Sequence, residues 1–238
     1  MKNPFKKSIV SKAALLFFSV ASFSLTGCID DEVDPVEPTP VAAVSFYHGS
    51  PDAPDLDIQL DSKVINSQPF KYTSFSGYTR LSPAAYRIKF TPVNTATAFV
   101  DSSYTFKDGK VYSVFAVNRQ ADMELLIVQD STNAPASGNA VLRVVNLSPD
   151  APEINISTKG STAVTVASDL AFKEITPFAA LAGNRYSFEV TSADNNEVLL
   201  TISNIDIEAG RAYTLVIRGF ATPPAGNTNA LAAQFIRN

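Results

Sequence analysis

The residues best suited to bind a ligand lie in two copies of one acidic turn. Residues 50–54 and residues 148–152 both have the sequence Ser-Pro-Asp-Ala-Pro. Calcium takes about six to eight oxygen ligands, largely from carboxylates and carbonyls, so the carboxylates in and after these turns are candidates for a calcium or ligand site. They are Asp52, Asp55, Asp57, Asp150 and Glu153. The pattern also suits a purely structural turn, because proline fixes φ and an Asp side chain bonds the backbone two residues on.

The sequence offers little for catalysis. The single histidine, His48, has Asn146 as its counterpart before the second turn, so a histidine general base or triad would exist in one copy only. The chain contains no Gly-x-Ser-x-Gly elbow and no glycine-rich phosphate loop. We therefore expect a protein that is not an enzyme and has no cofactor or resident metal, with His48 as a structural hydrogen-bonding residue.

A run of aromatic residues follows the first turn, comprising Phe70, Tyr72, Phe75 and Tyr78. Such rings could form a carbohydrate-stacking or protein-binding surface, or they could fill the interior of the domain. The chain contains no tryptophan, and the sequence favours the interior. The corresponding stretch of the second copy, residues 170–178, keeps fewer rings. Any aromatic binding surface is therefore expected in the first copy.

Residues 1–27 predict a cleavable export signal. A basic start is followed by an apolar run of about 13 residues, Ala13 to Leu25, whereas a helix that crosses a bilayer needs about 20. A basic start, a short apolar run and small residues are typical of secretory signals. The run ends in Leu-Thr-Gly-Cys at residues 25–28, which resembles the lipobox of bacterial lipoproteins. The resemblance implies cleavage before Cys28 and acylation of Cys28 by palmitate or similar chains, which anchor the protein to a membrane.

The residues after the signal narrow the location and the partners. Ile29 rather than Asp follows Cys28, and by analogy with lipoprotein sorting this favours the outer membrane of the cell envelope; Asp30 and Asp31 leave retention or surface display open. Loss of the signal removes four lysines and no acid, so the formal net charge falls from −4 to −8. Such a chain is repelled by phosphate backbones, which excludes nucleic acid as a partner. Without a second cysteine, neither a disulfide nor a thiolate zinc site can form.

The remainder of the chain repeats itself with a period near 100 residues and has the pattern of β-strands. Residues 86–90 and 186–190 alternate apolar and polar side chains, which places the apolar set on one face of a sheet. Four runs are apolar on nearly both faces and suit central strands packed on two sides; they are residues 44–47, 111–117, 141–145 and 213–217. Closing strands are expected at residues 124–128 and 231–236. With turns every 8 to 12 residues or so, this pattern predicts β-sandwiches.

The predicted organisation is all-β, with two tandem antiparallel β-sandwich domains of immunoglobulin or transthyretin type after the signal and a flexible tether. The acidic, proline-rich tether spans residues 28–43. The first sandwich spans residues 44–129, a linker residues 130–139, and the second sandwich residues 140–238. One large barrel is an alternative, which a flexible linker disfavours.

Ser-Pro-Asp-Ala-Pro directly after an apolar strand, followed by Asp55-Leu56-Asp57-Ile58 and later by a Gly-x-x-Tyr strand start, resembles the domain of unknown function DUF4397. The resemblance covers residues 44 to about 236 and implies exported or surface-attached bacterial proteins with tandem copies and no established activity. We expect a lipid-anchored, non-catalytic binding, adhesion or structural module whose partner is an envelope protein or glycan. The alternative is a periplasmic receptor for calcium or a small ligand.

Overall fold

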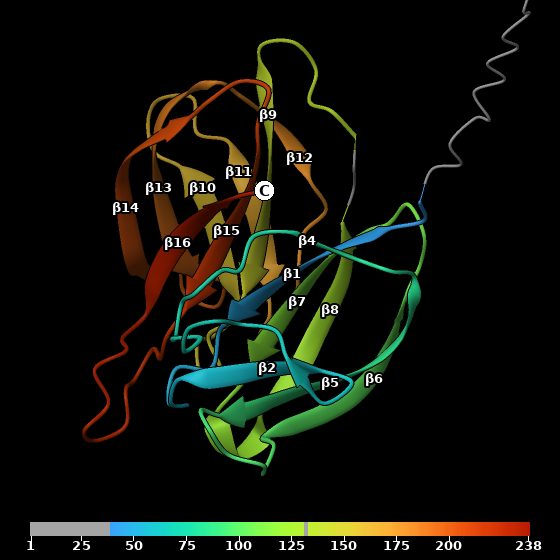
Figure 1. The fold of residues 1–238 in the computed structure, drawn as a ribbon. Helices are drawn as coiled ribbons and strands as arrows, with labels where there is room; N and C mark the ends of the chain where they lie inside the picture. Colours follow the sequence, from blue (N-terminus) through green and yellow to red (C-terminus); the bar gives the residue numbers. More distant parts are fainter. Residues whose placement is uncertain (1–38, 131–132) are drawn as a thin grey trace, which may run out of the picture. The chain divides into compact units, whose positions relative to one another are not determined.

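The computed structural model describes residues 39–130 and 133–238. The predicted signal, Cys28 and most of the predicted tether lie outside the described residues. Thr39–Asn238 form one compact unit, which contains two β-sandwiches and, within the described ranges, no α-helix (Figure 1). No helix in that part of the chain is long and apolar enough to cross a membrane. The predicted all-β class with two sandwich domains is confirmed.

The first sandwich is built from eight strands in two sheets with the orders β4-β1-β7-β8 and β3-β2-β5-β6. A single 3-10 turn, Gln120–Asp122, precedes the last strand. The facing sides of the two sheets form one hydrophobic core that includes Val44, Ile58 and Phe90. The strands are β1 (Ala42–His48), β2 (Leu56–Leu60), β3 (Lys63–Val64), β4 (Thr79–Leu81), β5 (Ala84–Pro92), β6 (Val100–Phe106), β7 (Val111–Val117) and β8 (Glu124–Asp130).

The second sandwich repeats this plan strand for strand, with the sheet orders β12-β9-β15-β16 and β11-β10-β13-β14. It has its own core, which includes Val144, Ile156 and Phe188. The strands are β9 (Asn139–Asn146), β10 (Ile154–Thr158), β11 (Thr165–Leu170), β12 (Ala179–Ala182), β13 (Asn184–Ser192), β14 (Val198–Ile207), β15 (Ala212–Arg218) and β16 (Ala232–Arg237).

One strand pair in each sandwich departs from the predicted antiparallel arrangement. Strands β1 and β7 pair in parallel, as do β9 and β15, whereas every other pair of neighbouring strands in the described chain is antiparallel. Between β1 and β7 the chain passes through the opposite sheet, and this long crossover allows the two strands to run in the same direction. Alternation along a strand reports which face is buried and carries no information about the direction of its neighbour.

The strands predicted to be buried on two sides are buried on two sides. Almost every residue of β1, β7, β9 and β15 is buried. One face of each strand packs into its own sandwich core, and the other face contributes to a third hydrophobic cluster that both sandwiches share. The cluster, which we call the interface cluster, comprises Tyr47, Phe115, Val117, Val145, Leu147, Val216 and Ile236.

A buried ion pair also joins the two sandwiches. Arg143 of β9 is 2% exposed and Asp130 of β8 is 7% exposed, and Arg143 Nη1 donates to Asp130 Oδ1 at 2.5 Å. The other guanidinium nitrogens donate to Ser113 Oγ and Thr214 Oγ1, each at 2.9 Å. The hydroxyl of Tyr78 donates to Asp130 Oδ2 at 2.7 Å. Asp130, placed by the sequence at the start of the linker, is thus the last residue of β8 and part of a buried polar network.

Candidate functional site

The two acidic turns are held by their own aspartates. Asp52 Oδ1 accepts a hydrogen bond from the backbone N–H of Gln120 at 2.7 Å. The carboxylate of Asp150 accepts hydrogen bonds from the N–H groups of Ala221 at 2.7 Å and Thr222 at 3.1 Å. Each aspartate therefore fixes the loop that follows the parallel central strand, β7 or β15. This geometry supports the structural interpretation of both turns.

The other predicted ligand residues do not converge. Asp57 Oδ2 accepts from the N–H of Asn94 at 2.9 Å, while Asp55 and Glu153 are exposed. Within residues 39–130 and 133–238, no group of three or more His, Cys, Asp or Glu side chains is arranged to hold a metal ion. Calcium binding at these turns stays a prediction.

His48 lies at the end of β1 with its side chain fully buried. Its Nε2 is 3.1 Å from the carbonyl oxygen of Pro54; because that oxygen can only accept, Nε2 carries the proton. The ring stacks on Phe70 at 6.4 Å and meets the edge of Tyr72 at 5.9 Å. The counterpart Asn146 donates to the carbonyl oxygen of Leu170 at 3.1 Å. Both residues thus tie a strand end to a neighbouring loop, as expected of a structural hydrogen-bonding residue.

Burial lowers the pKa of His48 from its ordinary value of 6.5, against the opposing effects of the Pro54 hydrogen bond and the Asp55 charge. The unfolded state therefore binds a proton at a higher pH than the folded state, so stability falls as the pH drops below about 6.5. His48→Asn, which copies the second sandwich, is expected to lose less stability than the parent between neutral and mildly acidic pH. Urea unfolding of both proteins on either side of this range measures the difference. Identical pH dependence would assign the acid sensitivity to other groups.

The aromatic run divides between the interior and a cleft. Phe70 belongs to the first core, and Phe75 packs against the interface cluster. Tyr78 bonds Asp130. The interior role favoured by the sequence is thus confirmed for Phe70. At the same time, Phe70 and Phe75 line a hollow of about 350 Å³ at one edge of the first sandwich, which the sequence did not predict.

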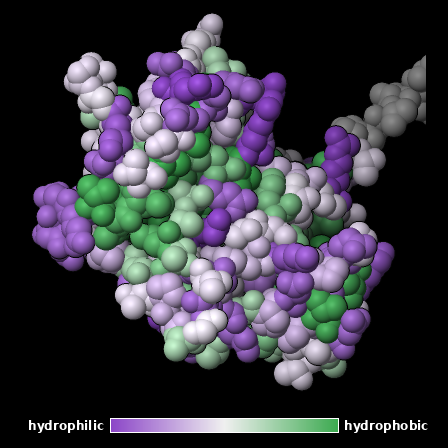
Figure 2. Space-filling model, turned by 90° about the vertical axis from the view of Figure 1, so that its left-hand side faces the viewer, coloured by the Kyte–Doolittle hydropathy of each residue, from purple (hydrophilic) through white to green (hydrophobic). Residues whose placement is uncertain are grey.

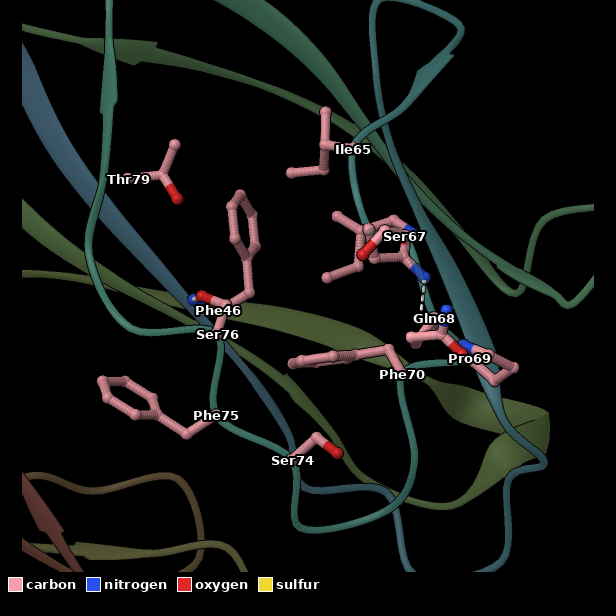
Figure 3. A pocket seen from close by; sticks show the side chains of 12 residues that line it. Phe46, Ile65, Ser67, Gln68, Pro69, Phe70, Ser74, Phe75, Ser76 and Thr79 are labelled. Atoms are coloured by element: carbon pink, nitrogen blue, oxygen red, sulfur yellow. Dashed lines mark hydrogen bonds between the residues drawn. The ribbon is translucent and has the colours of Figure 1, made fainter.

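This hollow, which we call the first-sandwich cleft, lies between the segment that follows β3 and the segment that leads into β4 (Figure 3). Its apolar lining consists of Phe46, Ile58, Ile65, Pro69, Phe70 and Phe75. Its polar lining consists of Asn66, Ser67, Gln68, Ser74, Ser76 and Thr79. In Figure 3 the ring of Phe46 stands between the Thr79 side and the Ile65 side, and Phe70 lies below it.

The cleft exists because the side chain of Asn66, rather than a neighbouring strand, pairs with the edge of β2 beyond β3. Asn66 Oδ1 accepts from the N–H of Ile58 at 2.7 Å, and Asn66 Nδ2 donates to the carbonyl oxygen of Leu56 at 3.2 Å. The amide therefore satisfies the edge of β2 as a neighbouring strand would. The backbone of residues 66–69 is then free to leave the sheet, and β3 ends after two residues.

In the second sandwich the equivalent edge, that of β10, is covered by a paired strand, β11. Strand β11 pairs with β10 along Ile154↔Leu170, Ile156↔Ala167 and Ser157↔Thr165. Val166 of this strand packs against the second core, and the hollow left beside β12 is about 30 Å³. Nine residues, 61–69, separate the end of β2 from Phe70, whereas eleven, 159–169, separate the end of β10 from the equivalent Leu170. The shorter segment in the first sandwich leaves the space open.

The surface around the cleft is mixed in polarity. Val64 and Ile65 at its edge are 44% and 39% exposed, and Val164 in the second sandwich is 45% exposed. Figure 2 shows one face of the molecule, on which hydrophobic residues gather in more than one place with hydrophilic residues between them. No residue that lines the cleft is charged. The cleft therefore offers apolar contacts and neutral hydrogen-bonding groups.

One protein-family model matches part of this chain. Residues 42–157 match the family model described as "Domain of unknown function (DUF4397)"; the match begins with β1 and ends within β10. No curated protein matches the sequence. A solved structure of CBMbc (family CBM26) from Eubacterium rectale Amy13K, in complex with maltoheptaose, is similar with a TM-score of 0.27 and 10% identity, over 82% of this chain and 97% of that chain.

Proposed function

Since this chain carries a DUF4397 domain at residues 42–157, we propose that it is a non-catalytic binding module, anchored by lipid at Cys28 in the cell envelope, whose ligand site is the first-sandwich cleft. The observation that carries the proposal is the difference between the two copies. One edge is open over about 350 Å³ in the first sandwich and packed by β11 in the second.

The shape of the cleft favours a ligand site over a flat adhesive surface. Ligand sites are concave, of about 300–1,000 Å³, and combine apolar walls with a few polar groups. The first-sandwich cleft has these features, because Phe46 and Phe70 lie inside it and Gln68 and Thr79 stand at its walls (Figure 3). The aromatic residues line a hollow and do not form an exposed platform.

The anchor is proposed from the sequence. Leu-Thr-Gly-Cys at residues 25–28 follows an apolar run, and acylation of Cys28 supplies chains whose buried CH₂ groups contribute about 0.8 kcal/mol each. Ile29 in place of Asp supports the outer membrane as the site of anchoring. The acidic, proline-rich residues that follow suit a tether that presents the sandwiches away from the bilayer.

Thr79→Trp tests the cleft, since residue 79 is exposed and a large ring there fills the space between the walls. Residues 39–238, which form the compact unit, are mixed with envelope fragments of the producing cell and sedimented. We expect the parent to be retained and Thr79→Trp to be released, with thermal unfolding unchanged. The matched control is Ala179→Trp, at the equivalent position of the second sandwich. Equal retention of the parent and Thr79→Trp, or no retention of the parent, contradicts the proposal.

The anchor is tested in the same cells with the full chain. The parent is expected in the membrane fraction with a lipid-modified N-terminus, and Cys28→Ser is expected to lose that modification, as mass spectrometry of the N-terminal peptide would show. A Cys28→Ser form that is processed and acylated like the parent contradicts the anchor and leaves the cleft proposal in place.

A further inference from the structure

The lining of the first-sandwich cleft points to a neutral glycan segment as its ligand; this inference rests on the function proposed above. We infer it from three observations: hydrogen-bonding side chains that have no partner among residues 39–130 and 133–238, an apolar floor, and an edge of β2 that cannot accept a peptide strand.

Four polar side chains at the cleft are available to a ligand. Ser67 and Gln68 lie on the wall that follows β3, and Ser74 and Thr79 lie on the opposite wall (Figure 3). None of these four side chains makes a hydrogen bond or ion pair with another described residue, whereas Asn66 and Ser76 beside them are hydrogen-bonded to backbone groups. Hydroxyl and amide groups both donate and accept. This pairing matches sugar hydroxyls, which also do both.

The floor of the cleft complements the apolar side of a sugar ring. Phe46 and Ile58 are each 1% exposed and Phe70 is 6% exposed, so the apolar surface that the floor offers to a ligand comes mostly from the more exposed Ile65, Pro69 and Phe75 beside them. Phe70 is held from behind by the stacked ring of His48 at 6.4 Å. A pyranose carries C–H groups on its faces and hydroxyls around its rim, and it can therefore contact this floor while its rim reaches the walls.

The absence of charge among the lining residues disfavours an anionic ligand. A carboxylate, sulfate or phosphate placed among these side chains would lose water without gaining a counter-ion, which is strongly unfavourable. The ion pairs nearest in sequence, such as Arg87 with Asp101, belong to β5 and β6 and do not line the cleft. The ligand is therefore expected to be neutral.

The edge of β2 also disfavours an extended peptide. A peptide that adds to a sheet needs free N–H and C=O groups along the edge strand. Here Asn66 occupies the N–H of Ile58 and the carbonyl of Leu56, and Leu56 and Phe70 exchange both of their backbone hydrogen bonds. The N–H of Ile65 donates a hydrogen bond to the carbonyl oxygen of Ile58. The edge of β2 is therefore already paired and does not offer these groups to a peptide.

The experiment measures binding of short neutral oligosaccharides to residues 39–238 by titration calorimetry. The probes are malto-, cello- and chito-oligosaccharides, with polygalacturonate as the anionic comparison. The test variant combines Gln68→Ala with Thr79→Ala, which removes two unpartnered groups and leaves the backbone pairing intact. The control combines Thr165→Ala with Ser168→Ala on β11, at the closed edge of the second sandwich, where both residues are exposed.

We expect a neutral series to bind, the test variant to bind about tenfold more weakly, and the control to bind as the parent does. Three outcomes overturn the glycan inference: no neutral series binds, polygalacturonate binds in preference, or binding is insensitive to the test variant. If envelope retention still depends on residue 79 but is abolished by protease treatment of the envelope, the ligand is a protein; the cleft then stays the binding site and only the glycan inference fails. Loss of the Thr79→Trp effect removes the proposed function itself.

Discussion

Replacement of Asp130 by alanine is expected to lower the free energy of unfolding by about 3–5 kcal/mol, because it leaves a buried guanidinium without its counter-ion. Arg143 is 2% exposed, and it cannot escape the charge by losing a proton. Removal of Asp130 also deprives the hydroxyl of Tyr78 of its acceptor. The effect is therefore larger than that of an ordinary ion pair.

The matched control is Asp101→Ala on the opposite sheet of the first sandwich. Asp101 also pairs with an arginine, Arg87, through two hydrogen bonds of 2.7 Å, but the two side chains are 33% and 60% exposed. The Arg87 guanidinium lowers the pKa of Asp101, but water screens this exposed pair, so the loss of stability is expected to be much smaller than that for Asp130→Ala. Equal losses for the two alanine variants would show that the Arg143–Asp130 pair is not shielded from water.

A double variant distinguishes the destabilisation caused by the unpaired charge of Arg143 from that caused by the loss of contacts to Asp130. Adding Arg143→Met to Asp130→Ala removes the unpaired cation and keeps an unbranched apolar side chain in its place. We expect the double variant to be more stable than Asp130→Ala alone, since a buried pair replaced by apolar groups is often close to neutral. A double variant that is as unstable as the sum of its two single variants contradicts this explanation. Urea unfolding followed by fluorescence of the tyrosines measures all four proteins.

Gly219→Ala is expected to destabilise the protein by about 3 kcal/mol or more, through backbone strain and a steric clash together. Gly219 follows β15 with a φ of +83°, and a Cβ built there would lie 2.2 Å from the carbonyl oxygen of Ala230. Because the clashing atom belongs to the backbone, it cannot move away by a rotamer change as a flexible side chain would. The loop is further tied down by the hydroxyl of Ser148, which donates to the carbonyl oxygen of Gly219 at 2.7 Å.

Gly210→Ala is the control for strain alone. Its φ is +78°, and a Cβ there would have nothing within 4 Å. It is expected to destabilise the protein by about 1–2 kcal/mol. Gly219→Asn provides a second check: the equivalent residue of the first sandwich, Asn118, has a φ of 76°, so asparagine tolerates this conformation but still carries the clashing Cβ. If Gly219→Asn restores stability, strain rather than the clash dominates. Thermal unfolding of the three variants decides.

Alternation and apolar runs along the chain were enough to locate about half of the strands in the described residues. Strand β7 has the bounds that the apolar run 111–117 predicted, and the double burial of β1 and β9 also followed from the pattern. The pattern could not say what covers their second face, because it reports burial and not the identity of the neighbour. The only local signal of the interface was Arg143, a charged residue inside the apolar run 141–145, whose partner lies in a different sandwich.

The cleft could not be predicted in the same way. It depends on Asn66, which looks like an ordinary loop residue until its amide is seen to bond Ile58 and Leu56. The loss of alternation over residues 65–69, ending in Pro69, was a weak sign that no strand continues there. The acidic turns show the reverse case. Their hydrogen bonds follow from local turn chemistry, so the structural interpretation was accessible from the sequence.

The two-residue difference between the segments 61–69 and 159–169 has an evolutionary consequence. After an internal duplication, a short deletion or insertion beside one sheet edge is sufficient to uncover an edge that was covered by a strand. Neither hydrophobic core has to change. One copy can then diverge toward recognition while the other keeps its packed edge.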